Sequence, residues 1–339
     1  MSYSQLLSLR ALLTDIQYEE FINYLSTLSP TSKIRVSTTA ANCKIDSSLI
    51  SKVFQALCKD GILKHTFAIK CPDCNLLLEE VESIPDIDTE KYCYNCDESV
   101  EISSDDIDVI YTFIKYPFIN GQHTEVLSGL SGFVVQDIDS LTHLVKNNDL
   151  DFNSLFYLPT DNDYALLQEL YNNVFKKHPT TKQQGDTLEK LIAQLFSLCK
   201  HFSVSPIRTE TNQIDCYVRN KLYIPGISDS SCTDSYVIEC KNEATKPKGS
   251  YISKLHSILK TSGKTFGIIV SKMSAPKTFI SLSNKIFLKD NIIIISIDKA
   301  DLQSIIYDRE NLLECIERKI DEVKLQASQD LVEYGLYKR

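Results

Sequence analysis

Two carboxylates and a lysine lie on two strand-like segments in the second half of the chain. Asp215 follows Ile214 in one apolar run, and Glu239 and Lys241 end a second run that begins at Ser235. Alternate side chains of a strand share a face, so Glu239 and Lys241 point the same way. An acid and a lysine within a run suited to burial need a compensating interaction. An ion pair between them would provide it, and so would a divalent metal shared with Asp215.

The local charge favours phosphate chemistry at these residues. The 339-residue chain has a formal net charge of −9, which by itself argues against a nucleic-acid partner. Residues 181–300, however, hold seventeen Lys and Arg against ten Asp and Glu, a local charge of +7. Residues 71–105 hold one against eleven, a local charge of −10. The carboxylates and lysine therefore lie in the basic part of the chain, as phosphate binding requires.

Apolar patterning predicts the elements that must position these residues. A helix is expected from Gly185, with Glu189 beside its buried stripe. The pattern after it predicts strands over 202–208, 213–218 and 236–241, a helix over 250–260, a strand over 265–270, a helix over 276–287 and a strand over 292–297. The last strands are unbroken apolar runs, which favour a sheet covered on both faces. The expected fold class is α/β (α+β), with a central mixed sheet flanked by helices.

This succession resembles the PD-(D/E)XK, or restriction-endonuclease-like, nuclease superfamily, and is most similar to Mrr-type restriction endonucleases and archaeal Holliday-junction resolvases. The matching residues are Gly185-Asp-Thr-Leu-Glu189, Ile214-Asp215 and Ile238-Glu-Cys-Lys241-Asn242. The resemblance covers about residues 183–298. It departs from the family pattern in two ways, because isoleucine rather than proline precedes Asp215 and residues 219–234 form a long insertion.

The resemblance implies a Mg²⁺-dependent endonuclease that hydrolyses DNA phosphodiester bonds and leaves 5′-phosphate and 3′-hydroxyl ends. Asp215 and Glu239 would bind Mg²⁺, with the Cys240 carbonyl as a third ligand. Lys241 would orient the attacking water, and we expect the cleft to lower its pKa. Glu189 would hold a metal-bound water or a second metal. The basic residues that follow the motif are placed to track the DNA backbone, and they are Lys246, Lys248 and Lys254.

Four of the eleven cysteines form two Cys-x-x-Cys pairs, Cys71 with Cys74 and Cys93 with Cys96, separated by eighteen residues. This spacing supplies four thiolates for one tetrahedral zinc, with no open coordination position. We therefore expect a structural zinc ribbon. The intervening segment is acidic and would repel a phosphate backbone, which makes the ribbon a candidate surface for a protein partner.

The first seventy residues follow the order of a winged helix-turn-helix. A short helix over 38–43, a turn over 44–46, a longer helix over 48–59 and a strand over 62–69 are expected. Asp46 or Ser47 can cap the longer helix. The candidates for reading DNA are its polar residues, Ser48, Ser51, Lys52, Gln55 and Lys59. None is arginine, and many such domains bind proteins instead.

The expected organisation has five segments. They are a winged helix-turn-helix (1–70), a zinc ribbon (71–104), a helical linker domain (105–180), a PD-(D/E)XK nuclease domain (181–300) and a C-terminal helix (301–339). The helical pattern of the last segment covers about residues 301–325. The start lacks a signal-peptide pattern and there is no run of eighteen apolar residues, so we expect a cytoplasmic protein without membrane association.

This module order suggests a prokaryotic restriction or antiviral defence nuclease. The last helix, about 301–325, packs on its own domain by default, and the alternative is that it forms a dimer seam. A homodimer is expected on the second ground, since cutting both strands of DNA usually takes two active sites. The alternative is a DNA-binding regulator or adaptor, acting through the winged helix and zinc ribbon, whose nuclease-like domain does not cleave.

Overall fold

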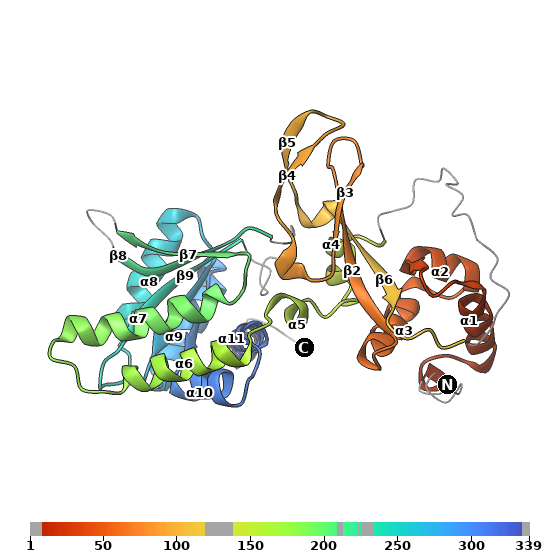
Figure 1. The fold of residues 1–339 in the computed structure, drawn as a ribbon. Coiled ribbons are helices and arrows are strands. Elements are labelled where there is room, and N and C mark those ends of the chain that lie inside the picture. Colours follow the sequence, from red (N-terminus) through yellow and green to blue (C-terminus); the bar gives the residue numbers. More distant parts are fainter. Residues whose placement is uncertain (1–8, 119–137, 209–212, 223, 225–233, 334–339) are drawn as a thin grey trace. The chain divides into compact units, whose positions relative to one another are not determined.

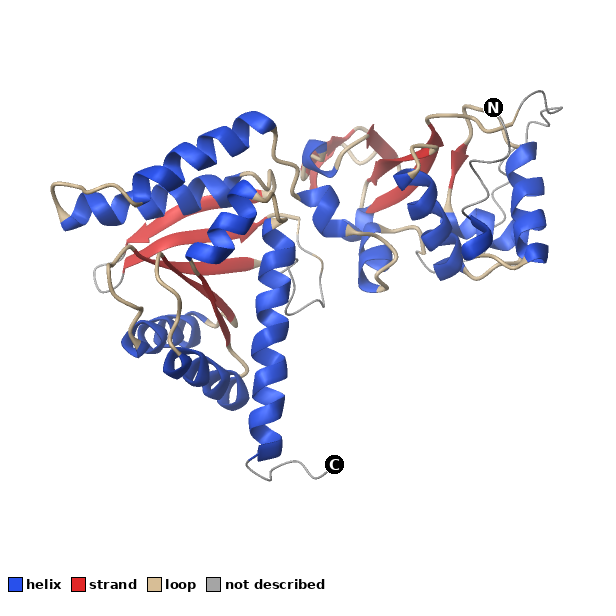
Figure 2. Cartoon of the chain, turned by 90° about the horizontal axis from the view of Figure 1, so that it is seen from below, coloured by secondary structure: helices blue, strands red, loops and turns tan. Residues whose placement is uncertain are grey.

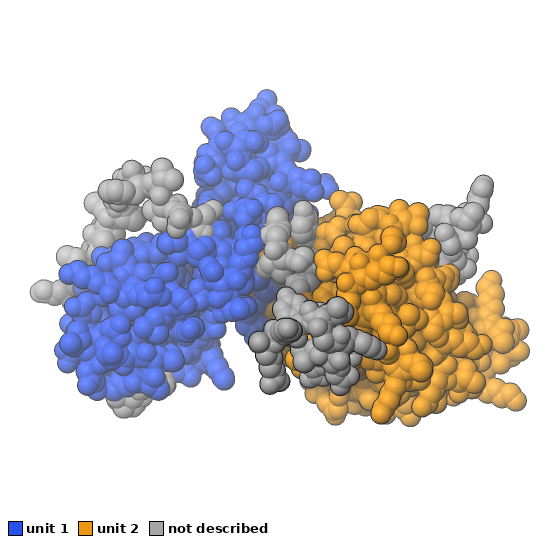
Figure 3. Space-filling view, turned by 180° about the vertical axis from the view of Figure 1, so that it is seen from behind, with its two compact units in different colours: residues 1–152 blue, residues 153–339 orange. Residues whose placement is uncertain are grey.

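The computed structural model describes residues 9–118, 138–208, 213–222, 224 and 234–333 (Figure 1). Helices and strands both occur throughout these residues, which confirms the expected mixed α/β class (Figure 2). The chain forms two compact units, residues 1–152 and 153–339 (Figure 3). None of the described helices combines the length and apolarity that crossing a bilayer demands.

Three helices open the first unit: α1 (Asp15–Thr27), α2 (Val36–Cys43) and α3 (Ser47–Lys59). Lys44 turns the chain between α2 and α3 in the left-handed conformation, with φ 55°. The Asp46 side chain caps α3 by accepting hydrogen bonds from the first backbone amides of the helix, as predicted. The apolar faces of these helices pack around aromatic rings, and the Phe54 ring centroid lies 4.7 Å from that of Tyr111.

An antiparallel sheet in the order β1-β6-β2-β3 completes the packing of this unit. Its strands are β1 (Lys33–Ile34), β2 (Leu63–Lys70), β3 (Leu77–Val81) and β6 (Ile107–Phe113). The prediction that residues 105–180 are mainly helical is wrong for β6. Its β-branched and aromatic residues suit a strand, and it pairs with β2 from Leu63 opposite Phe113 to Ile69 opposite Ile107. The zinc-ribbon residues are thus inserted within this sheet rather than following it.

The rest of segment 105–180 is helical where it is described, in α4 (Leu141–Lys146), α5 (Phe152–Phe156) and α6 (Asp161–Val174). This segment is divided between the two units, since their boundary falls at residue 152. Smaller elements between β3 and β6 are η2 (Ile84–Asp86), β4 (Glu90–Cys93), β5 (Glu98–Glu101) and η3 (Ser104–Asp106).

The second unit is built on a five-stranded mixed sheet in the order β11-β10-β9-β8-β7. Its strands are β7 (Phe202–Arg208), β8 (Gln213–Asn220), β9 (Ser235–Lys241), β10 (Phe266–Ser271) and β11 (Ile293–Ile297). The first three pair antiparallel and the last three parallel. These bounds agree closely with the predicted strands, and the last three of them are short apolar runs between clear breaks.

Helices cover both faces of this sheet (Figure 2). On one face α7 (Thr181–Ser197) contacts β7, β8 and β9, whereas on the other α8 (Gly249–Ser262) contacts β9 and β10, beside α9 (Lys277–Asp290). Helix α7 begins four residues before the predicted start at Gly185. The Thr180 side chain caps it by accepting from the Gln183 amide, so the polar residues 181–184 form its first turn.

Gly267 in β10 brings α8 unusually close to the sheet. A Cβ atom at this position would lie 2.8 Å from Leu259 Cδ1 and 3.0 Å from Leu255 Cδ2. Both leucines are buried in the core that also holds Val237 and Ile269. The close packing fixes the position of α8, and with it the polar side chains that this helix carries beside β9.

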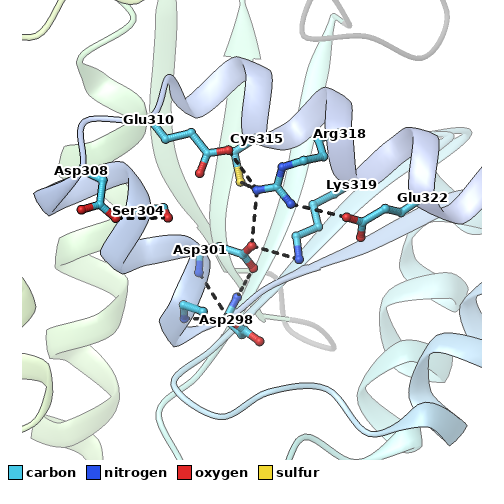
Figure 4. Close-up of polar contacts among 10 residues, drawn as sticks. Asp298, Asp301, Ser304, Asp308, Glu310, Cys315, Arg318, Lys319 and Glu322 are labelled. Carbon is cyan, nitrogen blue, oxygen red and sulfur yellow. Dashed lines mark hydrogen bonds and ion pairs between the residues drawn. The ribbon is translucent and has the colours of Figure 1, made fainter.

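The predicted C-terminal helix is interrupted, since residues 299–333 form two helices, α10 (Lys299–Tyr307) and α11 (Leu312–Glu333). Arg309 adopts a left-handed conformation with φ 61°, and Asn311 accepts from the Leu313 amide at 2.8 Å. Apolar spacing alone did not reveal this break. Asp301 of α10 then lies 3.0 Å from Lys319 Nζ and 3.7 Å from Arg318 Nη2 of α11, which ties the two helices together (Figure 4).

Candidate active site

Asp215 and Glu239 lie side by side on neighbouring strands of the second unit. Cys216 of β8 lies opposite Ile238 of β9, and continuing this antiparallel register by one residue brings Asp215 opposite Glu239. Both side chains are nearly inaccessible, with 9% of Asp215 and 3% of Glu239 exposed. The structure therefore brings together two carboxylates that sequence patterning predicted on separate strands.

Three oxygen atoms converge on the Lys241 ammonium. Its Nζ lies 2.7 Å from Glu239 Oε1 and 3.6 Å from Asp215 Oδ2, and it donates to the Cys240 carbonyl oxygen at 3.0 Å. The Cys240 amide donates to Asp215 Oδ2 at 2.8 Å and holds that carboxylate in place. Two carboxylates and a carbonyl are hard oxygen ligands of the kind that Mg²⁺ prefers. The oxygen atoms that surround the Lys241 ammonium are therefore of the kind that would fit the predicted Mg²⁺.

Effects in opposite directions act on the pKa values of Asp215 and Lys241. Burial raises the pKa of Asp215, and the neighbouring charge of Glu239 raises it further, against the lowering effects of the Cys240 amide, Lys241 and Lys254. Burial lowers the pKa of Lys241, but the hydrogen bond and charge of Glu239 and the charge of Asp215 outweigh it, so the pKa is raised. The expectation of a lowered Lys241 pKa is therefore wrong.

Helix α8 contributes two further groups. Lys254 Nζ lies 2.8 Å from Glu239 Oε1, and Lys241 Nζ lies 5.3 Å from the centroid of the Tyr251 ring. The Tyr251 hydroxyl donates to Glu243. Sequence reasoning placed Lys254 only along the DNA backbone and missed Tyr251. Tyr251 and Lys254 are three residues apart on the helix that follows the Glu-x-Lys strand. This spacing could have indicated that both side chains lie on one face of that helix.

Glu189 approaches the two strands from α7, on the other face of the sheet from α8. Burial, then the charges of Asp215 and Glu189, raise the pKa of the Cys216 thiol to about 12. Glu189 also contributes to the raised pKa of Cys240, after burial, Asp215 and Cys216. Groups of three or more Asp, Glu, Cys or His side chains whose ligand atoms lie within 4.8 Å of one another could hold a metal ion. In the described part of the chain, each such group includes a cysteine. Glu189 is therefore close to the thiols of Cys216 and Cys240, and it does not form a three-carboxylate cluster with Asp215 and Glu239.

Asn242 links the end of β9 to the start of α7. Its side-chain amide donates to the Gln184 carbonyl at 2.6 Å and lies 3.1 Å from Thr187 Oγ1, and the Gln184 side chain donates to the Asn242 carbonyl at 2.8 Å. Asn242 and Thr187 are buried. These reciprocal hydrogen bonds determine how the Glu189 helix meets the strand that carries Glu239.

The four predicted zinc ligands lie at the tips of two hairpins in the first unit. Cys71 and Cys74 flank the turn between β2 and β3, and Cys93 and Cys96 flank the turn between β4 and β5. Their sulfur atoms come within 3.8 Å (Cys71 to Cys96) and 3.6 Å (Cys74 to Cys93). Tetrahedral zinc–thiolate bonds place sulfur atoms about 3.8 Å apart. The four-cysteine cluster can therefore hold a metal such as zinc.

Each zinc knuckle ends on a residue in the left-handed conformation. Asn75 has φ 58° and Asp97 has φ 60°, and their amides donate to the carbonyls of Cys71 (2.9 Å) and Cys93 (2.8 Å). Asn and Asp tolerate this conformation better than most residues other than glycine. The Leu76 amide is the main cause of a pKa of about 6 at Cys74. Burial raises the pKa of Cys71, and the hydrogen bond with Cys74 raises that of Cys96, so Cys74 is the one of these three thiols that most readily becomes a thiolate.

The polar face of α3 makes contacts within its own unit. Ser51 is fully buried, Ser48 Oγ donates to Asp149 Oδ1 at 3.0 Å, and the Gln55 amide donates to the Asp149 carbonyl. Of the five candidates for DNA reading, only the two lysines are exposed. Asp149, which follows α4, thus contacts two of the five residues that a recognition helix would present to bases.

No family model, curated protein or solved structure matches this chain.

Proposed function

We propose that the second unit is a Mg²⁺-dependent endodeoxyribonuclease with a restriction-endonuclease-like core. The convergence of Asp215, Glu239 and the Cys240 carbonyl on one cation is the observation that carries this proposal. The order of helix, three antiparallel strands, helix and parallel strand supports it, as do helices on both sheet faces. The raised pKa of Asp215 adds support, because a buried carboxylate pair is stabilised by a divalent cation.

Asp215, Glu239 and the Cys240 carbonyl would hold Mg²⁺, which polarises phosphoryl oxygens and makes bound water more acidic. Lys241 is an ammonium at neutral pH, as lysine ordinarily is. Its role is then to donate hydrogen bonds to the attacking water and to the phosphate oxygens, rather than to remove a proton. Glu189, approaching from α7, would orient a further water or a second metal ion.

For the first unit we propose a winged-helix fold that carries a structural zinc ribbon and binds a protein partner. The burial of Ser51 and the Asp149 contacts of Ser48 and Gln55 argue against base reading by α3. The acidic ribbon supports a protein-facing role, since it would repel DNA. These contacts also weaken the alternative of a DNA-binding regulator that acts through this helix.

We further propose, from module order alone, that the protein is a prokaryotic restriction or defence nuclease that acts in the cytoplasm as a homodimer.

The decisive experiment compares cleavage of supercoiled plasmid by wild type, Asp215→Asn and Asp290→Asn in Mg²⁺ and in EDTA. Asp290 is the matched control, because it also pairs with a lysine, Lys260 at 2.7 Å, but lies away from β8 and β9. We expect cleavage by wild type and Asp290→Asn only with Mg²⁺, and a loss of at least about 100-fold in Asp215→Asn. Equal nicking by all three proteins would overturn the proposal.

The same proteins should be assayed on unmodified, modified, single-stranded and branched DNA and on RNA. Cleavage of RNA alone would contradict the assignment to DNA while preserving a phosphodiesterase.

A further inference from the structure

Two lysines share a single carboxylate oxygen in the candidate site. Lys241 Nζ and Lys254 Nζ lie 2.7 Å and 2.8 Å from Glu239 Oε1. Lys241 comes from the same strand as Glu239, whereas Lys254 comes from α8. The Lys254 side chain is 44% exposed although Glu239 is 3% exposed, so this lysine reaches a buried carboxylate from the solvent side.

The charges show what the second lysine is suited to do. Asp215, Glu239, Lys241 and Lys254 together sum to zero when all are ionised. A divalent cation on the two carboxylates would bring the total to +2 and would compete with both ammoniums for the Glu239 oxygen. A phosphodiester has one negative charge, and a second develops as water adds to phosphorus. Two lysines released from Glu239 therefore match the charge that the reaction creates.

The packing of α8 keeps Lys254 in reach of this position. Leu255 and Leu259 are buried and lie against Gly267, where the absent Cβ allows close approach. Tyr251, one turn before Lys254, presents its ring to Lys241 at 5.3 Å. The helix thus presents an aromatic ring and an ammonium beside the strand that carries Glu239.

We propose that Lys254 is a further catalytic residue, which leaves Glu239 and binds a non-bridging oxygen of the phosphodiester under attack. This inference rests on the proposed nuclease function. In the reaction the water oxygen bonds to phosphorus and the bond from phosphorus to the 3′ oxygen breaks. One water proton ends on the 3′ oxygen and the other stays with the 5′-phosphate or is lost to solvent. Lys254 exchanges no proton and stabilises charge only.

The test compares Lys254→Met and Lys254→Arg with Lys260→Met in the full-length protein. Lys260 is the matched control, because it lies on the same helix about 9 Å further along and pairs with Asp290 at 2.7 Å. Cleavage kinetics on a plasmid, and anisotropy of a fluorescein-labelled duplex with Ca²⁺ in place of Mg²⁺, separate turnover from binding.

We expect kcat of Lys254→Met to fall at least about tenfold with KM within about twofold, and Lys254→Arg to recover part of the loss. Lys260→Met should stay within about twofold of wild type. If Lys254 only tracks the DNA backbone, Lys254→Met should instead raise KM. The slope of the logarithm of duplex affinity against the logarithm of salt concentration should then become shallower by about one unit. That second pattern would overturn the inference.

Calorimetric titration of the nucleic-acid-free proteins with Mg²⁺ gives a readout independent of turnover. Lys254→Met should bind the ion more tightly than wild type and Lys260→Met, because a competing cation is removed from Glu239. Slower cleavage together with tighter metal binding would not arise from a merely structural defect. Weaker Mg²⁺ binding with a lowered melting temperature would show such a defect and contradict the inference.

The two proposals fail in different ways. If wild type and Lys260→Met cleave DNA and Lys254→Met cleaves it equally well, the role of Lys254 is wrong and the nuclease stands. If neither wild type nor Lys260→Met cleaves any nucleic acid with Mg²⁺, the proposed function itself fails.

Discussion

Lys241 illustrates how the surroundings of a side chain change the role that its type suggests. A lysine in a cleft is expected to have a lowered pKa, because burial disfavours its charge. Here burial does act in that direction, but Glu239 at 2.7 Å and Asp215 at 3.6 Å act against it and prevail. The sequence contains all three residues, yet the balance depends on distances that only the folded sheet sets. An ammonium that donates hydrogen bonds is the consequence.

We expect the stability of the first unit to depend on pH because of His65 in β2. Burial lowers its pKa to about 4, and its Nε2 atom is buried with no hydrogen-bond partner among the described residues. The unfolded chain binds a proton near pH 6.5 but the folded state does not, so stability falls as pH drops from 6.5 towards 4. The lowered pKa of His65 corresponds to a loss of about 3 kcal/mol in the free energy of unfolding once the pH is below both pKa values.

Denaturant unfolding at pH 7 and pH 4.5 measures this effect, with His65→Phe as the reference. Phenylalanine keeps the ring packing against Tyr111, whose centroid lies 5.2 Å away, and does not titrate. The variant should lose about 2 to 3 kcal/mol less stability than wild type over this range. Parallel losses in the two proteins would contradict the account.

At the scale of elements, Gly267 controls the distance between α8 and the sheet. Gly267→Ala should destabilise the second unit by about 1 to 3 kcal/mol, since its Cβ would meet Leu259 at 2.8 Å. It should also slow cleavage, because α8 carries Lys254. Thermal unfolding and plasmid cleavage measure the two effects.

Gly185→Ala is the control, since Gly185 lies within α7 with no atom near its missing Cβ. Alanine there should leave stability unchanged or raise it by up to about 1 kcal/mol. Equal behaviour of the two variants would show that Gly267 does not set the helix position.

The elements that sequence patterning predicted are those whose signals are local. Strand β9 is an apolar run with Glu239 and Lys241 at its end, and α3 has both its cap at Asp46 and its buried stripe in adjacent residues. Strand β6 was missed although its β-branched and aromatic residues are a local strand signal, and its pairing with β2 across the zinc-binding insertion is what the sequence does not show. The break between α10 and α11 was missed because apolar residues keep helical spacing on both sides of it. The contact of Lys254 with Glu239 likewise required the packing of α8.

At the scale of the whole molecule, the two compact units differ in the kind of metal that their candidate ligand atoms suit. Four thiolates in the first unit suit zinc, whereas carboxylate and carbonyl oxygens in the second suit Mg²⁺. The carboxylate site and the basic residues around it belong to residues 153–339, and the acidic ribbon belongs to residues 1–152. The net charge of −9 conceals this division.

The zinc site should stabilise the first unit alone. We expect about one zinc per chain, and none in a Cys71→Ser/Cys96→Ser variant, because two of four ligands are lost. Metal analysis and limited proteolysis check this, with new cleavage expected between β2 and β6 and not in residues 153–339. Full zinc content in the variant would contradict the assignment.

The central claim is that Asp215 and Glu239 form a Mg²⁺-dependent phosphodiesterase site, and plasmid cleavage by wild type, Asp215→Asn and Asp290→Asn tests it most directly. We expect Mg²⁺-dependent cleavage by wild type and Asp290→Asn, and a loss of at least about 100-fold in Asp215→Asn with an unchanged melting profile. Cleavage by Asp215→Asn at the wild-type rate would contradict it.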